Sequence, residues 1–105
     1  MLLKYKIRFV GSDIITDYDG MNYYAAIAEK FDHPIAKDEI FVNENLSFIE
    51  KVHTIIHEIV EAEYMRVYGW DYWKAHRLAD KIEEISANII VISNALQKLL
   101  YAKAV

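Results

Sequence analysis

The residues best suited to chemistry are His57, Glu58 and Glu61, which form a His-Glu-x-x-Glu motif in a segment with helical periodicity. A helix places His57 and Glu61 on one edge, one turn apart, so the two side chains can share a divalent metal. Histidine and glutamate are both zinc ligands. Glu58 points about 100° away around the helix, which lets it reach a metal-bound water rather than the metal. The motif predicts a metal site with Glu58 as catalytic general base.

A third ligand must come from elsewhere in the chain, and His76 is the best candidate. It lies in the next predicted helix, and a turn at Gly69 would bring it back toward Glu61. Two histidines and one carboxylate leave a coordination position for water, as catalytic zinc sites do. We therefore expect His57, Glu61 and His76 to bind the metal.

Other polar residues near the motif could support the site or replace a ligand. Asp80 and Glu83 follow on the same face of the second helix as the predicted third ligand. His53 precedes the motif by one turn and lies closer to the apolar stripe, so we expect a buried structural histidine or a residue that contacts a ligand. Tyr72 or Tyr68 could donate a hydrogen bond to an oxyanion, although both fit equally well as packing aromatics.

The motif lies on the first of two long predicted helices. Ser47 stands three residues before Glu50, which is the spacing of a capping box, and Gly69 is typical of a helix end. These signals predict an active-site helix over residues 47–68. Its expected core stripe consists of Ile49, Val52, Ile56, Ile59, Val60 and Val67.

The second helix is predicted over residues 71–103, with Asp71 as its N-cap. Its apolar residues recur in alternating steps of three and four, and no glycine or proline interrupts them. They are Ala75, Leu78, Ile82, Ile85, Ile89, Ile92, Leu96 and Leu99.

Residues 1–46 are expected to form strands and turns. Tyr5, Ile7 and Phe9 alternate with basic residues, as in a strand, and residues 40–42 read as a short buried strand. Residues 22–31 fit either a helix or a strand. The whole chain, 1–105, is expected to be a single α+β domain, with a small N-terminal sheet or hairpin followed by two long helices packed on one of its faces.

Composition excludes several classes of protein. The chain of 105 residues is 54% hydrophobic, as folded domains are, and has a net charge of -4 with no basic run, so no nucleic-acid partner is expected. It has no cysteine, which excludes cysteine zinc sites and a thiol nucleophile. The longest wholly apolar run is Ile89–Ile92, so we expect no membrane span and a cytoplasmic location.

The motifs over residues 40–84 resemble those of small zincin-like proteins encoded by phages and other viruses. The shared pattern is a short strand, then the His-Glu-x-x-Glu helix at 57–61, then Gly-x-x-Tyr-x-x-Ala-His-x-x-Ala at 69–79. The resemblance implies a minimal metallopeptidase-like fold, with His57, Glu61 and His76 as zinc ligands and Glu58 as general base. This chain has a glutamate where many zincins have a second histidine. A carboxylate ligand adds negative charge and reduces the Lewis acidity of the metal, so this departure is expected to weaken peptidase activity.

Two other readings remain open. The pairs Glu58-x-x-Glu61 and Asp80-x-x-Glu83 look somewhat like the magnesium-binding carboxylates of MazG-like all-α nucleotide pyrophosphohydrolases. Alternatively, the apolar pattern from Ala75 to Leu99 spans more than three heptads, which favours pairing with a second copy. We therefore expect a homodimer through the C-terminal helix, and the chain could then serve as a non-enzymatic scaffold or adaptor of viral origin.

Overall fold

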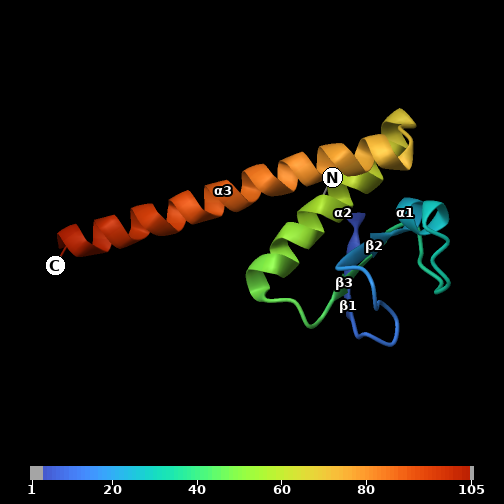
Figure 1. Ribbon diagram of the computed structural model, residues 1–105, viewed down its shortest axis with the longest axis horizontal. Coiled ribbons are helices and arrows are strands. Elements are labelled where there is room, and N and C mark those ends of the chain that lie inside the picture. The colour runs from blue at the N-terminus through green and yellow to red at the C-terminus, as the bar shows by residue number, and fades with distance from the viewer. Residues whose placement is uncertain (1–3, 105) are drawn as a thin grey trace.

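The computed structural model describes residues 4–104, with side chains up to residue 100, and has the predicted α+β architecture (Figure 1). A small sheet at the N-terminus is followed by long helices, which confirms the predicted fold class. The elements are β1 (Lys6–Val10), β2 (Gly20–Asn22), α1 (Tyr23–Ala28), β3 (Glu39–Asn43), α2 (Phe48–Tyr68) and α3 (Tyr72–Ala104).

The three strands form one sheet in the order β1-β3-β2. The central strand, β3, is parallel to β1 and antiparallel to β2. Its residues Ile40, Phe41 and Val42 are fully buried, which confirms the predicted buried strand. A run of apolar residues is typical of a strand that is covered on both faces.

Each face of the sheet has its own apolar cluster, because successive side chains of a strand point to opposite faces. Ile40 and Val42 pack with Ile59 and Ala62 of α2, whereas Phe41 packs on the other face with a separate cluster. That second cluster comprises Val10, Ile15, Met21, Ala25 and Ala26. Helix α2 therefore covers one face, and β2 and β3 are held against it.

The ambiguous segment 22–31 begins as the last residue of β2 and continues as α1. Asn22 has extended backbone geometry, and its side chain accepts a hydrogen bond from the Ala25 amide at 2.9 Å. This N-cap satisfies one of the free amides of the first turn and starts the helix. Two of the three alanines of this segment, Ala25 and Ala26, are buried against the sheet, whereas Ala28 is exposed.

Helix α2 has the predicted ends. The Ser47 hydroxyl accepts from the Glu50 amide, and the Glu50 carboxylate accepts from the Ser47 amide, so both halves of the capping box are present. Gly69 adopts the left-handed conformation at φ 65°, which ends the helix at little steric cost. Asp71 then caps α3 by accepting from the Lys74 amide at 3.0 Å.

The predicted core stripe of α2 was wrong at both ends, where Ile49 and Val67 are 45% and 51% exposed. Only Ile59 of that stripe, at 8% exposed, is buried. The buried face of α2 is instead largely polar, and it consists of Thr54, His57, Glu58, Ile59, Glu61 and Ala62. This polar face is buried because of tertiary packing: the sheet and α3 together cover the edge of α2 that carries the His-Glu-x-x-Glu motif.

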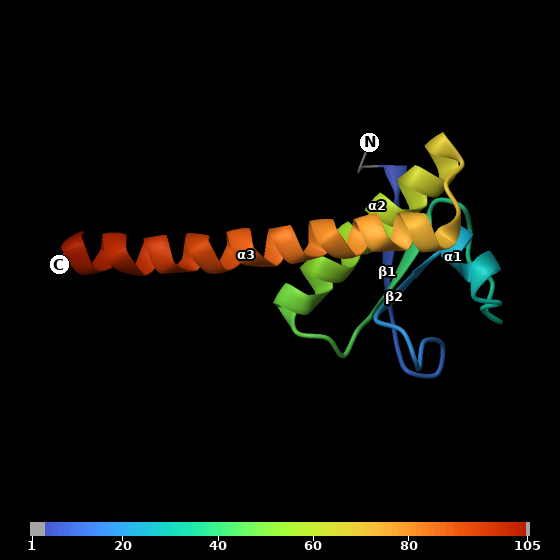
Figure 2. The ribbon, with the colours of Figure 1, turned by 45° about the horizontal axis from the view of Figure 1, so that its top comes forward.

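Helix α3 packs on α2 rather than on the sheet, which corrects the expectation that both long helices lie on one face of the sheet. Ala75 and Ala79 are fully buried, and their small side chains allow α3 to lie close to α2. Farther along, α3 leaves the body of the molecule and extends freely, as both ribbon views show (Figures 1 and 2). Among the residues that the structure describes, no helix is long and apolar enough to cross a membrane.

Glu63, on the sheet-facing side of α2, joins a cluster of polar groups that ties the start of β1 to this helix. Its carboxylate lies 2.7 Å from Lys4 Nζ and 3.0 Å from Arg66 Nη2, and it accepts a hydrogen bond from the Tyr5 hydroxyl. The hydrogen bond from Arg66 outweighs partial burial and, with Lys4 and Tyr5, lowers the pKa of Glu63 to about 2.

We predict that Glu63→Gln destabilises the fold in a pH-dependent way. Because the pKa is lowered in the folded state, the charged carboxylate stabilises the protein above the ordinary glutamate pKa, and this stabilisation is lost as the pH falls toward 2. The expected loss at neutral pH is about 1–2 kcal/mol after allowance for solvent screening. Urea unfolding at a series of pH values measures it, with Glu84→Gln on the exposed side of α3 as control. A constant difference from pH 7 to pH 3 would contradict the prediction.

Candidate metal centre

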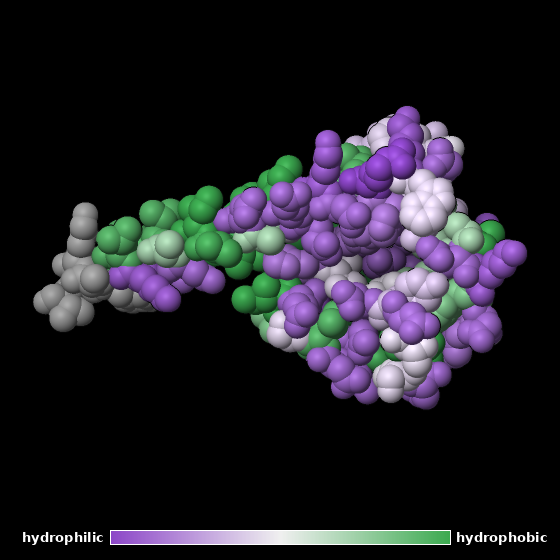
Figure 3. Space-filling model, in the orientation of Figure 1, coloured by the Kyte–Doolittle hydropathy of each residue, from purple (hydrophilic) through white to green (hydrophobic). Residues whose placement is uncertain are grey.

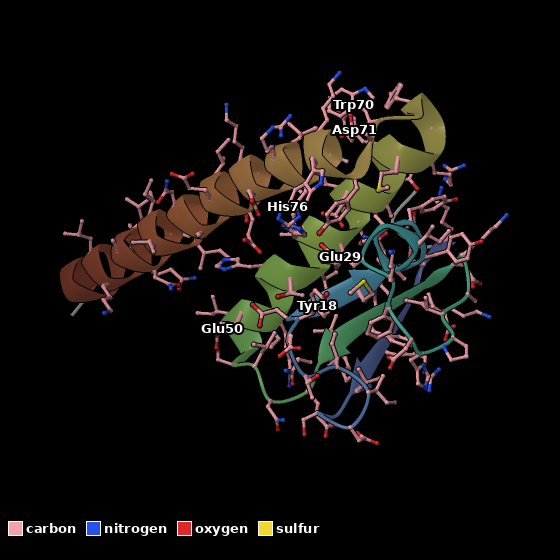
Figure 4. All side chains as sticks on the ribbon, turned by 45° about the vertical axis from the view of Figure 1, so that its right-hand side comes forward. Tyr18, Glu29, Glu50, Trp70, Asp71 and His76 are labelled. Atoms are coloured by element: carbon pink, nitrogen blue, oxygen red, sulfur yellow. The ribbon has the colours of Figure 1, made fainter. Side chains whose placement is uncertain are left out.

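The structure brings His57, Glu61 and His76 together where α3 crosses α2. Glu61 Oε2 lies 3.1 Å from His57 Nε2 and 2.7 Å from His76 Nδ1. The rings of the two histidines are 4.9 Å apart and nearly perpendicular. His76 lies on the side of α3 that faces α2 (Figure 4). Three potential ligand atoms thus lie within 4.8 Å of one another, as the sequence predicted for this trio.

Asp80 contacts the same two histidines on their other nitrogens. Its carboxylate lies 3.3 Å from His57 Nδ1 and 3.5 Å from His76 Nε2. Each imidazole is therefore held between a buried carboxylate, Glu61, and the half-exposed carboxylate of Asp80. A carboxylate behind a histidine ligand orients the ring and fixes its tautomer. Glu83 also lies close, and with His57 and Asp80 it forms a second group of potential ligand atoms within 4.8 Å.

Glu58 lies beside this cluster, and its carboxylate is oriented by Asn22. Asn22 Nδ2 donates to Glu58 Oε1 at 2.9 Å and to Glu61 Oε1 at 3.0 Å, so one amide group holds both carboxylates. The other oxygen of Glu58 lies 3.9 Å from His57 Nε2, the atom that faces Glu61. Glu58 therefore lies next to His57 and Glu61, in a position from which it could reach a metal-bound water.

Asn22 reaches the two carboxylates because β2 lies very close to α2. A Cβ atom at Gly20 would lie 2.6 Å from Thr54 Cγ2 and 2.9 Å from Glu58 Cγ, so no larger residue fits there without a shift. The alternation of β2 then turns Asn22, two residues later, toward the same helix. Sequence reasoning missed Asn22. A polar residue before a helical segment is an N-cap signal, but nothing in the sequence links it to partners 36 and 39 residues away.

The charges of the site are strongly coupled. Burial and the negative charge of Glu61 raise the pKa of Glu58, whereas hydrogen bonds from His57 and His76 outweigh burial and lower that of Glu61. Burial opposes the charged form of His57, but its hydrogen bond to Glu61 and the nearby carboxylates prevail and raise its pKa to about 9. These shifts favour a positive charge on His57 beside an ionised Glu61, and they disfavour a second negative charge on Glu58.

A cavity of about 300 Å³ opens over these residues. Six carboxylates line it, and they belong to Asp17, Asp19, Glu58, Glu61, Asp80 and Glu83. Such a concentration of negative charge with few basic neighbours favours a cation in the cavity. In Figure 3 hydrophilic residues gather along the side of α3 that borders the body of the molecule.

The two tyrosines considered for an oxyanion role occupy different places. Tyr72 lines the cavity, with its ring 5.3 Å from that of His76. Burial and the carboxylates around it raise its pKa, so the hydroxyl stays protonated and can donate a hydrogen bond. Tyr68 is 65% exposed, and its ring contacts that of Tyr64 rather than the cavity.

His53 lies outside the cluster of three potential ligands. It is half-buried one turn before His57, and its Nε2 atom is buried without a hydrogen-bond partner within residues 4–104. It lines a neighbouring cavity together with Glu50, Asp80 and Glu83. It lies on the edge of the groove between the two long helices.

The donor set fits a zinc ion. Ligand atoms of a tetrahedral site with bonds of about 2.0–2.1 Å are separated by about 3.3 Å. The separations of 2.7 and 3.1 Å from Glu61 Oε2 are close to this value, and all three potential ligand atoms lie within 4.8 Å of one another. Nitrogen donors suit zinc, copper, iron or nickel, whereas magnesium prefers oxygen.

The chain matches no protein family, no curated protein and no solved structure. The chemistry of the site itself is therefore the basis for inferring a function.

We predict that Asn22→Leu, a change of similar volume, destabilises the fold by about 2–4 kcal/mol. It removes the N-cap of α1 and leaves the buried carboxylates of Glu58 and Glu61 without their shared donor. Asn45→Leu on an exposed turn is the control and should change stability by less than about 1 kcal/mol. Urea unfolding measures both. Equal stability of the two variants would show that the amide contributes nothing.

Proposed function

We propose that this protein binds zinc through His57, Glu61 and His76 and acts as a metallopeptidase-like hydrolase. The observation that carries the proposal is the convergence of two imidazole nitrogens and one carboxylate oxygen from neighbouring helices, within 4.8 Å of one another. Three protein ligands leave one position of a tetrahedral site for water or substrate. The resemblance to small viral zincin-like proteins supports the same set of ligands.

The burial of these groups supports a functional role over an ordinary polar edge. His57, Glu58 and Glu61 are 7%, 6% and 1% exposed in a small domain with a limited core. Burying ionisable groups is costly unless they are paired, and the domain could have filled this space with apolar side chains. Clusters of buried ionisable groups beside a cavity are typical of functional sites.

A bound zinc ion would supply Lewis-acid polarisation and would acidify a bound water. The other roles belong to the chain. Glu58, oriented by Asn22 and adjacent to the ligands, would take a proton from the attacking nucleophile and pass it to the leaving group. Tyr72 would donate a hydrogen bond to an oxyanion in the cavity. Asp80 would orient both histidines.

A magnesium-dependent nucleotide pyrophosphohydrolase is less well supported. Its oxygen-only site would leave His57 and His76 without a role, although both histidines turn toward Glu61. The three-stranded sheet is also foreign to the all-α architecture of MazG-like enzymes. A metal-stabilised scaffold without activity is the remaining alternative, and activity measurements separate it from a hydrolase.

The metal is tested by elemental analysis of the purified protein after zinc loading and dialysis. We expect about one zinc per chain in the wild type and a loss of at least about tenfold in His57→Ala, because the remaining two ligands bind weakly. Zinc should also raise the melting temperature of the wild type but not of the variant, since a ligand stabilises only the state that binds it.

The matched control is His53→Ala, which removes a histidine one turn away on the same helix and should keep its zinc. His76→Ala, at a half-exposed position on α3, repeats the test if His57→Ala folds poorly. Equal zinc content in all four proteins would eliminate the proposed site. Loss of zinc in His53→Ala but not in His76→Ala would move the site into the neighbouring cavity.

The catalytic role is tested with Glu58→Gln. We expect this variant to retain zinc and to lose at least about 100-fold in the hydrolysis of a quenched-fluorescent peptide library, since general-base catalysis contributes about 10²–10⁴-fold. Glu84→Gln on the exposed side of α3 is the control for a lost carboxylate. Full hydrolysis by Glu58→Gln would reject the general-base assignment, and zinc binding without any hydrolysis by the wild type would favour a scaffold.

A further inference from the structure

From Ile85 onward, α3 carries apolar side chains that are largely exposed. Figure 3 shows hydrophobic residues along this extension. Five of them form a stripe, each more than half exposed: Ile85, Ile89, Ile92, Leu96 and Leu99. We refer to these five residues as the apolar stripe. Exposed apolar patches of this extent mark interaction sites.

The apolar stripe is distinct from the side of α3 that packs on α2. Ala75 and Ala79 lie on the packed side, whereas the Ile85 and Ile89 pair is centred roughly 80° away around the helix. The predicted apolar pattern therefore divides into a buried part and an exposed part. Its beginning, at Ala75, is buried within the chain, and the part from Ile85 onward is available to a partner.

The spacing of the apolar stripe identifies the kind of partner. Its residues recur in steps of four, three, four and three, a mean period of 3.5 residues. This is the period that keeps one seam facing another helix in a left-handed coiled coil. A flat membrane surface or an irregular groove does not require this period, whereas a second helix of the same spacing does.

The residues beside the apolar stripe favour a second copy of the same chain. Ser86, Asn88, Ser93 and Ala95 flank it, and all are small or uncharged. No charge occurs from Ile85 to Gln97, so two identical helices meet without like-charge repulsion. A partner selected by charge would need complementary flanking residues, which this segment lacks.

The apolar area is sufficient for such a pairing. Each exposed side chain of the apolar stripe would remove on the order of 100 Å² from water. With the neighbouring Leu100, which is 67% exposed, six side chains supply about 600 Å² on each copy. A stable interface takes about 800 Å² per partner, and the flanking side chains provide the remainder.

We propose that two copies of this protein pair through the apolar stripe of α3 to form a homodimer. The contact lies on the extension of the helix, away from the metal ligands, so each copy keeps its own candidate site. The dimer does not depend on zinc.

Sedimentation equilibrium over a range of concentrations tests the proposal on the full chain. We expect a mass of twice the 12.3 kDa of one chain. The double variant Ile89→Asn/Ile92→Asn should weaken the dimer at least about 100-fold, while far-UV circular dichroism and zinc content report an intact body. The matched control Val91→Asn, at a 66% exposed position about 120° around α3 from the centre of the apolar stripe, should remain dimeric.

Two results would overturn the proposal. One is a single-chain mass at every concentration of the wild type. The other is unchanged association in the double variant, because another surface would then hold the copies together. His57→Ala should sediment like the wild type, and a shift to monomer in that variant would make association depend on the metal site instead.

Discussion

The arrangement of the whole domain depends on the need to satisfy two buried carboxylates. Glu58 and Glu61 are almost fully enclosed, and an ionised carboxylate in such a place requires donors or a cation. Asn22, His57 and His76 provide those donors from β2, α2 and α3. The same contacts that stabilise the charge therefore hold three elements in place. A cation in the cavity would perform the same task more strongly.

This constraint explains why a polar face of α2 is buried. In most amphipathic helices the apolar face packs on the core. In α2, Ile59 and Ala62 pack on the sheet, and the adjoining edge of the helix, which carries the His-Glu-x-x-Glu motif, lies between β2 and α3. Close packing makes this possible. Gly20 lets β2 approach α2, and Ala75 and Ala79 let α3 approach from the other side. Small residues thus position the large polar ones.

Much of the local structure could be predicted because its causes are local. The capping box of Ser47 and Glu50 and the left-handed Gly69 bound α2 through contacts within a few residues. The spacing of His57 and Glu61 is likewise a property of one helix. The core stripe was predicted wrongly at Ile49 and Val67 because helical periodicity shows which residues share a face, but not which face other elements cover.

The sequence by itself determined the fold class, the ends of the long helices and the trio that would meet if the chain turned back at Gly69. Only the tertiary structure decided that Asn22 joins Glu58 and Glu61, that Asp80 lies behind both histidines, and where along α3 burial ends and the apolar stripe becomes exposed. Contacts of the first kind depend on backbone geometry over one or two turns. Those of the second kind depend on how separate elements pack, which no local pattern encodes.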